Sequence, residues 1–555
     1  MRDLDLNGLW QFRFCENVGL DAAEAGDYPD WMCVPGVFDA QPDRYCRRGT
    51  GLYRREFVLD ETAAGARLRV DGMGLRARFA VDGREIGRSA LAYAPLEFET
   101  GPLAAGRHVL TAAVDNTFGA GEGELFLPYY DFYAFGGFYG GVSLKTWTGA
   151  FGLDRVFVRT LDFRTGRVRL DFAFAGDGPA DFSAKIAFDG GAPCEVAVRG
   201  GKVELDVPDH QVWSPETPHL HTLTAEVGGE VCRETFGIRE IRTSGNRLLL
   251  NGRDLYLRGF NRHESSGMSG GASAASLMLT DLQNLKRLHG NFIRGCHYSQ
   301  RETFLDLCDR MGVLVWDETL GWGNTAEQMK SPVFAARQRE ALERTIRAGA
   351  NHPSIIIWGF MNELASDTEE GEAFVEMLCN TARAADDTRL VTFACCRPLT
   401  DRANRCTDFI AYNTYPGWIS DDYAGSPTSG MAENQRKILH ALRERFGADK
   451  PVIVSEMGTC AIYGQHDAAN AQWTEEFQAE YLKSVMETVF AEPDIRGLTI
   501  WQMCDAKSYL RQGANIRCKP LALNLAGVFD VYRRPKLAVQ TVAGAFAEHE
   551  NAEKK

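Results

Sequence analysis

The sequence predicts a multidomain chain in which two β-sandwiches precede a (β/α)8 TIM barrel. Three observations lead to this prediction: a length of 555 residues, short runs of alternating polarity up to residue 243, and eight nearly continuous apolar runs from residue 244 onward. The length suits three or four domains of ordinary size, or fewer if one is a large barrel. A hydrophobic share of 45% supports packed cores rather than disorder.

The first 243 residues contain strand signals of period two, separated by glycine-containing turns. They include Leu52–Val58, Ala66–Val70, Arg78–Val81, His108–Val114, Val168–Phe172 and Leu223–Val227. Alternation that recurs about every 8 to 12 residues is typical of antiparallel sandwiches. We therefore expect one sandwich over residues 1–150 and a smaller, immunoglobulin-like sandwich over residues 151–243.

Residues 244–555 follow a different rhythm, in which apolar runs alternate with helical periodicity, for example over Leu277–Leu288 and Ile438–Phe446. The eight runs are Leu255–Phe260, Asn291–Gly295, Val313–Asp317, Ile355–Phe360, Leu390–Ala394, Phe409–Asn413, Val452–Ser455 and Gly497–Trp501. Strands that are apolar on both faces belong to parallel sheets covered by helices, and eight of them predict a barrel. An open doubly wound sheet is the alternative, but no glycine-rich nucleotide-binding loop follows any run.

Two of these runs end in a carboxylate. The fourth leads into Met361-Asn362-Glu363 and the seventh into Glu456. A barrel carries its chemistry at the carboxyl ends of its strands, where strands four and seven face each other across the mouth. Two facing carboxyl groups, one protonated and one ionised, are the machinery of glycoside hydrolysis. The alternative is that each glutamate forms a buried ion pair with a neighbouring cation.

The residues around these carboxylates resemble glycoside hydrolase family two, which includes β-galactosidases, β-glucuronidases, β-galacturonidases and β-mannosidases. Asn351–Glu363 looks like the acid/base signature of that family, and Asn251–Glu264 with Asn291–Tyr298 is similar to its other marker. Asn7–Trp10 with Phe12 resembles the start of its sugar-binding jelly roll. The resemblance covers the whole chain and implies a jelly roll, an immunoglobulin-like sandwich and a catalytic barrel.

The resemblance also implies roles for individual residues. Glu363 would be the general acid/base, Glu456 the nucleophile and Asn362 the partner of the sugar 2-hydroxyl, with Arg294 steadying the nucleophile. The implied sugar subsite holds His297, Tyr298, Asn413, Tyr415 and Trp501. Alternatives stay open for three of these: Trp501 as barrel packing, His297 as a structural histidine and Tyr415 as part of the barrel rim.

Within the family, the resemblance is closest to the β-glucuronidase branch. Asp131–Gly137 is similar to a segment of that branch whose Asp reaches from the first domain into the sugar site, and Asn413–Trp418 and Trp473–Gln478 also resemble it. One position departs. Glucuronidases hold the sugar carboxylate with Asn-x-Lys, and here Asn524 is kept while Ala526 replaces the lysine. The missing cation forfeits a charge-assisted hydrogen bond.

A local basic cluster precedes this position. Lys507, Arg511, Arg517 and Lys519 stand near the single acid Asp505, in a chain of net charge −14. We expect one of these cations to take over the carboxylate, because a guanidinium suits that ligand well. The alternative is a solvated loop or a subunit contact.

These observations predict a retaining exo-β-glycosidase that acts on terminal β-galacturonides and/or β-glucuronides through two glutamates. The alternatives are a β-galactosidase acting on neutral β-galactosides and a non-catalytic carbohydrate-binding protein. We expect a small carbohydrate substrate, no metal and no other cofactor. The net charge of −14 argues against nucleic acid, and no apolar run suits a signal peptide or a membrane helix. We expect a cytoplasmic protein, and the resemblance implies a homo-oligomer.

Overall fold

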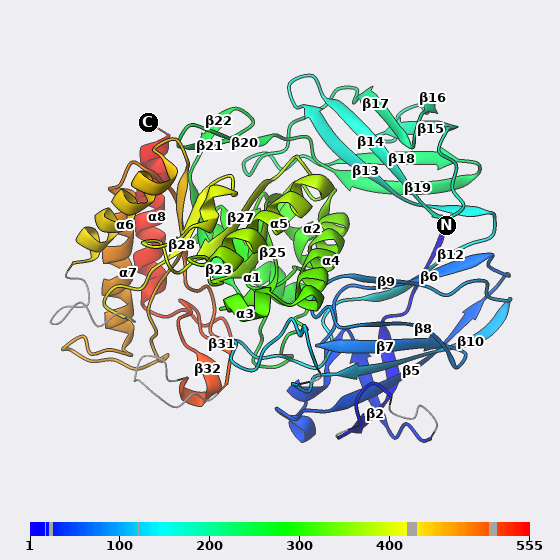
Figure 1. Ribbon diagram of the computed structural model, residues 1–555, viewed down its shortest axis with the longest axis horizontal. Helices are drawn as coiled ribbons and strands as arrows, with labels where there is room; N and C mark the ends of the chain where they lie inside the picture. Colours follow the sequence, from blue (N-terminus) through cyan, green and yellow to red (C-terminus); the bar gives the residue numbers. More distant parts are fainter. Residues whose placement is uncertain (17, 22–25, 120, 419–429, 510–518, 555) are drawn as a thin grey trace.

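A computed structural model describes the chain except for residues 17, 22–25, 120, 419–429, 510–518 and 555. It contains two β-sandwiches side by side and a barrel packed against both of them (Figure 1). The predicted fold class is confirmed by these sheets and by the closed eight-stranded barrel. Among the described helices, none is both long enough and apolar enough to cross a membrane.

The first sandwich consists of a six-stranded and a four-stranded antiparallel sheet, ordered β3-β2-β5-β10-β7-β8 and β1-β12-β6-β9. The strands are β1 (Arg2–Asp5), β2 (Gly8–Cys15), β3 (Asp30–Val34), β5 (Thr50–Leu59), β6 (Gly65–Val70), β7 (Arg76–Val81), β8 (Arg84–Ser89), β9 (Leu96–Glu99), β10 (Gly106–Asp115) and β12 (Val142–Trp147), with β4 (Gly36–Val37) pairing β11 (Gly137–Phe138). Inward-facing aromatic residues fill the space between the sheets, and Trp10, Tyr53 and Phe138 pack in edge or tilted contacts.

The second sandwich has a hydrophobic core of its own, separate from that of the first. Its two sheets are ordered β13-β14-β17 and β16-β15-β18-β19. The strands are β13 (Phe151–Asp162), β14 (Arg167–Gly176), β15 (Phe182–Phe188), β16 (Cys194–Val198), β17 (Lys202–Asp206), β18 (His221–Val227) and β19 (Glu230–Phe236). A small sheet of β20 (Ile241–Ser244), β21 (Arg247–Leu250) and β22 (Arg253–Leu255) follows it.

The barrel closes in the order β23 to β30, with parallel neighbours throughout. Its strands are β23 (Leu257–Arg262), β24 (Phe292–Gly295), β25 (Leu314–Trp322), β26 (Ile355–Asn362), β27 (Leu390–Cys395), β28 (Ile410–Asn413), β29 (Val452–Met457) and β30 (Ile495–Ile500). Each contains most of one of the eight predicted runs. Residues of the β20–β22 sheet join the first residues of β23, β24 and β25 in one apolar cluster, so this sheet covers the amino-terminal end of the barrel.

Helices surround the barrel: α1 (Ala275–Arg287), α2 (Glu302–Met311), α3 (Ala326–Met329), α4 (Pro332–Gly349), α5 (Glu369–Ala385), α6 (Met431–Phe446), α7 (Glu475–Phe490) and α8 (Ala538–Glu553). The two predicted helical segments correspond to α1 and α6. Their start signals are local: Thr368 caps α5 by accepting from Gly371 N–H, and Ser331 caps α4 just before Pro332. The buried side of each helix packs on the strands, as in α5 through Phe374 and Leu378.

The first sandwich reaches the open end of the barrel through the segment that follows β10. Tyr133 N–H donates to the carbonyl of Lys507 over 3.0 Å, and Ser508 Oγ donates to the carbonyl of Asp131 over 3.0 Å. Lys507 belongs to β31 (Ala506–Lys507), which pairs with β32 (Leu523–Asn524) beyond the last barrel strand. These contacts place a loop of the sandwich beside the carboxyl ends of the strands.

Candidate active site

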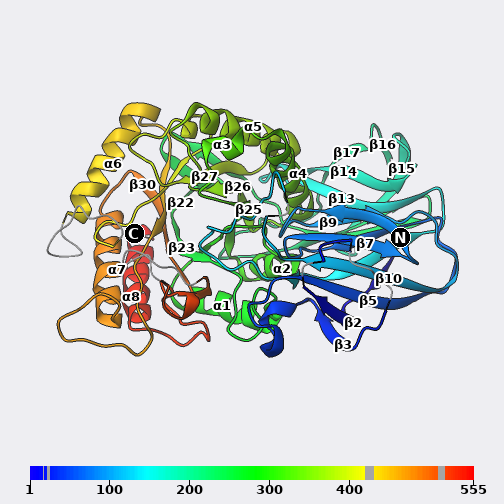
Figure 2. The ribbon, with the colours of Figure 1, turned by 60° about the horizontal axis from the view of Figure 1, so that its bottom comes forward.

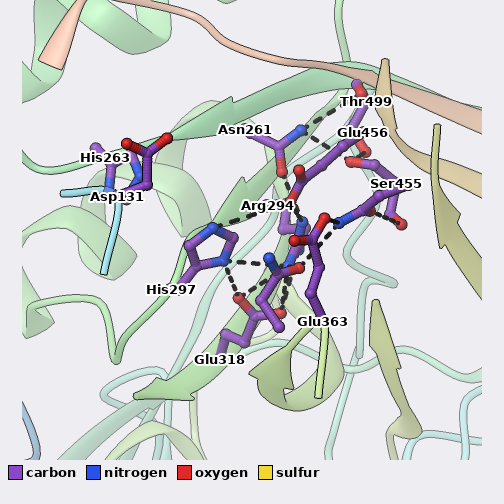
Figure 3. Close-up of polar contacts among 12 residues, drawn as sticks. Asp131, Asn261, His263, Arg294, His297, Glu318, Glu363, Ser455, Glu456 and Thr499 are labelled. Atoms are coloured by element: carbon purple, nitrogen blue, oxygen red, sulfur yellow. Dashed lines mark hydrogen bonds and ion pairs between the residues drawn. The ribbon is translucent and has the colours of Figure 1, made fainter. Parts of the chain in front are cut away.

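The carboxyl ends of the barrel strands surround a cavity of about 900 Å³. The predicted site residues that line it are Asp131, Glu363, Asn413, Tyr415, Glu456, Trp501, Lys519 and Asn524. Arg294, His297 and Asn362 lie beneath them and reach them through polar contacts. Figure 3 shows Arg294 and His297 beside the two glutamates. Most of the predicted site residues, which are spread from Asp131 to Asn524 in the sequence, are therefore brought to one place.

Glu456 lies in β29 and accepts two strong hydrogen bonds. Arg294 Nη1 donates to its Oε1 over 2.6 Å, and the hydroxyl of Tyr415 donates to its Oε2 over 2.6 Å. Burial raises the pKa of Glu456, but Arg294 and Tyr415 both oppose that rise. Donors of this kind favour the ionised form of Glu456. The hydroxyl of Tyr415 therefore does more than close the barrel rim.

Glu363 follows the last residue of β26 and has a different environment. Its Oε1 accepts one hydrogen bond, from Asn413 Nδ2 over 2.9 Å. Burial raises the pKa of Glu363 to about 7, and the negative charge of Glu456 adds to the rise. No ion pair of Glu363 with a described Lys or Arg is present, so the ion-pair alternative applies to Glu456 and Arg294 but not to Glu363. Glu363 is therefore partly protonated near neutral pH, whereas the donors around Glu456 favour its ionised form.

The backbone around Glu363 adopts conformations that non-glycine residues rarely take. Met361 and Glu363 have φ values of 45° and 56°. Left-handed φ costs free energy in such residues and persists only where surrounding contacts hold it. Here the amide of Glu363 donates to the carbonyl of Ala394 over 2.9 Å, and the carbonyl of Asn362 accepts from Gly323 N–H over 2.8 Å. The turn directs the Glu363 side chain into the cavity.

Arg294 is the centre of the buried network beneath the two glutamates. It is fully buried and contacts both oxygens of Glu318, at 2.8 and 3.1 Å, as well as Glu456. Asn261 Oδ1 and Asn362 Oδ1 accept further hydrogen bonds from it, at 3.0 and 2.9 Å, and its Nη2 also lies 3.2 Å from His297 Nδ1. One guanidinium thus lies between two carboxylates, which fixes its position and that of Glu456.

Two residues that matter here were missed in the sequence. Glu318 lies inside β25, which continues to Trp322, so the apolar run that seemed to end at Asp317 concealed it. Arg397 lines the cavity two residues after β27. Both residues follow closely after a predicted apolar run, so a search for charged residues just beyond each run could have found Glu318 and Arg397.

Two buried polar atoms beneath the cavity lining lack a hydrogen-bond partner among the described residues. They are Asn362 Nδ2 and His297 Nε2. His297 Nδ1 lies 3.0 Å from Glu318 Oε2, and Nε2 lies 3.9 Å from Glu456 Oε1. Burial, together with Arg294, lowers the pKa of His297 and keeps the imidazole neutral. Buried donors and acceptors left open in this way suit a ligand that carries hydroxyl groups.

The aromatic residues divide between the cavity and the interior. The Trp501 ring lines the cavity and stacks on the His297 ring, with centroids 5.5 Å apart and planes 11° apart. Tyr298 does not line the cavity, which corrects its assignment to the sugar subsite. Its hydroxyl accepts from Glu264 N–H over 2.9 Å, and its ring stacks on Tyr93 of the first sandwich at 4.3 Å. Tyr298 therefore packs the sandwich against the barrel.

The predicted basic cluster does not act as one unit. Lys519 lines the cavity, and its Nζ lies 3.0 Å from Asp131 Oδ2. Lys507 instead donates to the hydroxyl of Tyr45 on the first sandwich over 2.8 Å, which takes it out of the proposed role. Arg511 and Arg517 lie outside the described residues. Asn524 Nδ2 lies 3.4 Å from Asp131 Oδ2, and Ala526 lines the same cavity.

Two groups of described side chains are close enough to share a metal ion. One is His263, Cys296 and His297, and the other is Asp306, Asp309 and His352. In the first group the positive charge of Arg294 opposes a further cation. In the second, His352 Nδ1 lies 2.6 Å from Asp309 Oδ2, an ion pair that satisfies both groups. Existing protein contacts thus account for both arrangements.

Comparisons with known proteins agree with this geometry. Residues 241–548 match the family described as "Glycosyl hydrolases family 2, TIM barrel domain", and residues 155–239 match "Glycosyl hydrolases family 2". The chain is 27% identical to the beta-glucuronidase of Sus scrofa over 595 residues, 96% of this chain and 89% of that protein. Among solved structures, a GH2 beta-galacturonidase from Eisenbergiella tayi bound to galacturonate is similar with a TM-score of 0.88 and 31% identity, covering 99% of this chain and 97% of that one. A beta-glucuronidase from Faecalibacterium prausnitzii is similar with a TM-score of 0.85 and 26% identity, over 99% and 98% of the two chains.

Proposed function

Because the chain belongs to glycosyl hydrolase family 2, we propose that it hydrolyses terminal β-linked hexuronides with retention of anomeric configuration, using Glu363 and Glu456. The observation that carries the proposal is the contrast between the two carboxyls. Arg294 and Tyr415 donate to Glu456, whereas burial keeps Glu363 protonated up to a pH near its pKa of about 7. A retaining glycosidase needs this combination of an anion and an acid.

The reaction proceeds in two displacements. In the first, Glu456 attacks the anomeric carbon while Glu363 gives its proton to the leaving oxygen, so the aglycone departs as an alcohol and a glycosyl ester forms on Glu456. In the second, Glu363 takes a proton from water, whose oxygen attacks the anomeric carbon and releases Glu456 as a carboxylate. The protons balance over one turnover, and the two carboxyls return to their starting states.

The remaining contacts suit a sugar in the first subsite. Asn362 Nδ2 and His297 Nε2 are open to hydroxyl groups, and Trp501 offers an apolar ring at the cavity wall. Arg294 acts as a positioning residue because it holds Glu456 and Asn362 together. Asp131 brings a carboxylate from the first sandwich to the same cavity. Apolar side chains also line the wall and can contact an aglycone: Trp322, Leu399, Trp418 and Ile438.

The choice of a hexuronide is supported by similar proteins. Those described above are a beta-glucuronidase and a beta-galacturonidase bound to galacturonate. They do not favour the alternative of a neutral β-galactoside. A non-catalytic carbohydrate-binding protein is also not favoured, since both carboxyls and their distinct environments are retained.

Covalent labelling tests the mechanism. A 2-deoxy-2-fluoro-β-hexuronyl fluoride should leave a glycosyl adduct on Glu456, detected by intact mass and peptide mapping, and Glu456→Gln should take up none. Glu363→Gln should lower kcat on an aryl hexuronide by about 10²- to 10⁴-fold, the usual contribution of a general acid. Glu340→Gln, on the half-exposed side of α4, serves as the matched control. Labelling of another residue, or release of the inverted anomer seen by NMR, would refute the proposal.

We also propose that the protein is cytoplasmic and that it forms a homo-oligomer. A cytoplasmic location is supported by the described cysteines, all of which are free thiols. A homo-oligomer is supported by the family resemblance, and the native mass from light scattering tests it.

A further inference from the structure

We propose that Lys519 is the residue that recognises the substrate carboxylate, and that its ion pair with Asp131 makes the site select hexuronides over neutral sugars. The inference rests on the proposed function and assigns the recognition of the negatively charged substrate group to one side chain. Lys519 lies on the loop that leads into β32, and its side chain is 11% exposed. Its Nζ lies 3.0 Å from Asp131 Oδ2.

Two cations line the cavity among the described residues, and they are engaged differently. Arg397 Nη1 donates to the carbonyls of Glu363 and Leu364, at 3.2 and 2.9 Å, and its Nε lies 3.3 Å from Asp367. These contacts hold the turn beside the acid, so the guanidinium is already occupied. Lys519 instead contacts one carboxylate of the cavity wall, and its ammonium has further donors to offer. It is the cation that can be shared with a ligand.

Lys519 also lies on the correct side of the reacting carboxyls. Figure 3 shows Asp131 and His263 on the opposite side of His297 from Glu363 and Glu456. The carboxylate of a hexuronide projects from C5, across the ring oxygen from the anomeric carbon that Glu456 attacks. A sugar that presents its anomeric carbon to Glu456 can therefore present its carboxylate to the Asp131 side of the cavity.

The position expected to carry a lysine has lost its cation. Ala526 contributes only a methyl group to the cavity wall, and Asn524, two residues earlier, contacts Asp131 at 3.4 Å. Lys519 precedes Ala526 by seven positions. It lies before β32, and its Nζ contacts Asp131 Oδ2, the oxygen that Asn524 also contacts. The charge absent at 526 is thus supplied from 519.

Asp131 turns this contact into a selective one. Without the Lys519 ammonium, a hexuronide carboxylate would approach Asp131 with one positive charge fewer beside the two anions, and like charges repel in a largely buried site. With Lys519 between them, both anions share one cation through charge-assisted hydrogen bonds. A neutral sugar needs no such cation, so the effect of Lys519 should depend on the substrate charge.

The test uses substrates that differ only at C6: the 4-nitrophenyl β-galacturonide with the β-galactoside, and the β-glucuronide with the β-glucoside. Lys519→Met should lower kcat/KM on the preferred hexuronide by about 10- to 100-fold, mostly through KM, because a hydrogen bond to a charged group is lost. On the matching neutral glycoside it should change by less than about threefold. Adding Asp131→Asn to Lys519→Met should recover part of the hexuronide activity. Lys483→Met, on the exposed side of α7, is the matched control.

Two measurements keep the test decisive. Inhibition of the wild-type protein by galacturonate or glucuronate should be stronger than by galactose or glucose. Lys519→Arg, which keeps the charge if Lys519→Met does not fold, should retain a preference for the hexuronide. Equal losses on charged and neutral substrates, or an unchanged preference in Lys519→Met, would overturn the role of Lys519 alone. If the wild-type protein cleaves neutral glycosides and no hexuronide, the proposed function itself fails.

Discussion

Glu363 and Glu456 are the same residue type in the same barrel mouth, yet their neighbours give them different proton affinities. Glu456 accepts from a guanidinium and a phenol, while Glu363 accepts from one amide. The sequence places one carboxylate at the end of the fourth predicted barrel strand and one at the end of the seventh. This is enough to predict two catalytic candidates. It cannot supply the difference between them, because the donors come from β24, β28 and the loop after β28.

The raised pKa of Glu363 predicts the pH dependence of catalysis. As a general acid it must be protonated, so kcat/KM should fall as the pH rises above about 7. Glu363→Gln, assayed with a 2,4-dinitrophenyl leaving group that needs no proton, should lose this basic limb. Profiles of kcat/KM between pH 5 and 9 measure this basic limb. If the limb persists in Glu363→Gln, it reports the titration of another group.

The same pKa shift affects stability with a definite sign. A carboxyl whose pKa rises on folding binds its proton more tightly in the folded state, so its contribution to stability is lost as the pH rises from about 4.5 to about 7. Glu363→Gln should therefore raise the melting temperature at pH 8 and leave it nearly unchanged at pH 4, while the half-exposed Glu340→Gln should differ little at either pH.

At the scale of elements, the strands of the barrel were predicted closely and their lengths less well. All eight apolar runs became β23–β30, because a strand buried on both faces leaves an unbroken apolar signature. β25 extends to Trp322 and so contains Glu318, which the apolar pattern alone placed beyond the strand. Where a strand ends depends on its hydrogen bonds to β24 and β26, which sequence periodicity does not report.

β26 delivers Glu363, and its fit against β25 depends on a residue without a side chain. A Cβ on Gly359 would lie 1.8 Å from Trp316 Nε1. Gly359→Ala should therefore destabilise the protein by about 1–3 kcal/mol or more through overpacking and lower kcat by displacing Glu363. Thermal unfolding and initial rates measure the two effects.

Gly544, inside α8, provides the control for this substitution. A Cβ there would meet nothing within 4 Å. Gly544→Ala should stabilise the helix by about 0.5–1 kcal/mol, since alanine loses less backbone entropy than glycine. If Gly359→Ala were equally harmless, the close packing of β26 on Trp316 would not be what positions the acid.

At the scale of the whole molecule, one buried carboxylate joins all three parts of the chain. Asp154 in β13 of the second sandwich lies 2.7 Å from Arg67 and 3.3 Å from Lys145, both on the first sandwich, and 3.3 Å from Arg347 on α4. In Figure 2, β13 lies close to both α4 and the first sandwich. Although burial opposes it, Lys145 and Arg67 hold the pKa of Asp154 below its usual range.

Asp154→Asn should destabilise the assembled molecule at pH 7 by about 3–5 kcal/mol, because the mostly buried Lys145 loses the counter-ion it contacts, while Arg67 keeps its ion pair with Glu99. A lowered pKa stabilises the folded state above the unfolded value of about 4, and this stabilisation is lost as the pH falls below it. Calorimetry should show a lower midpoint at neutral pH and a difference that narrows in acid. The exposed pair of Asp60 with Arg2 gives the control, since Asp60→Asn should cost less than about 1 kcal/mol. Equal effects of the two variants would rule out a special role for Asp154.

By itself, the sequence determines the order of two sandwiches and a barrel, and the carboxylates that end strands four and seven. These properties are written in local periodicity and in the residue that follows each strand. Only the tertiary structure decides how the environments of the two carboxyls differ, that Lys519 lines the cavity, and that Tyr298 packs against the first sandwich. Those properties depend on side chains from distant segments meeting in a desolvated space, where charge and hydrogen bonding act over a few ångströms. The net charge of −14 is a property of the whole chain, whereas the proposed selectivity for a charged substrate depends on Lys519 and Asp131.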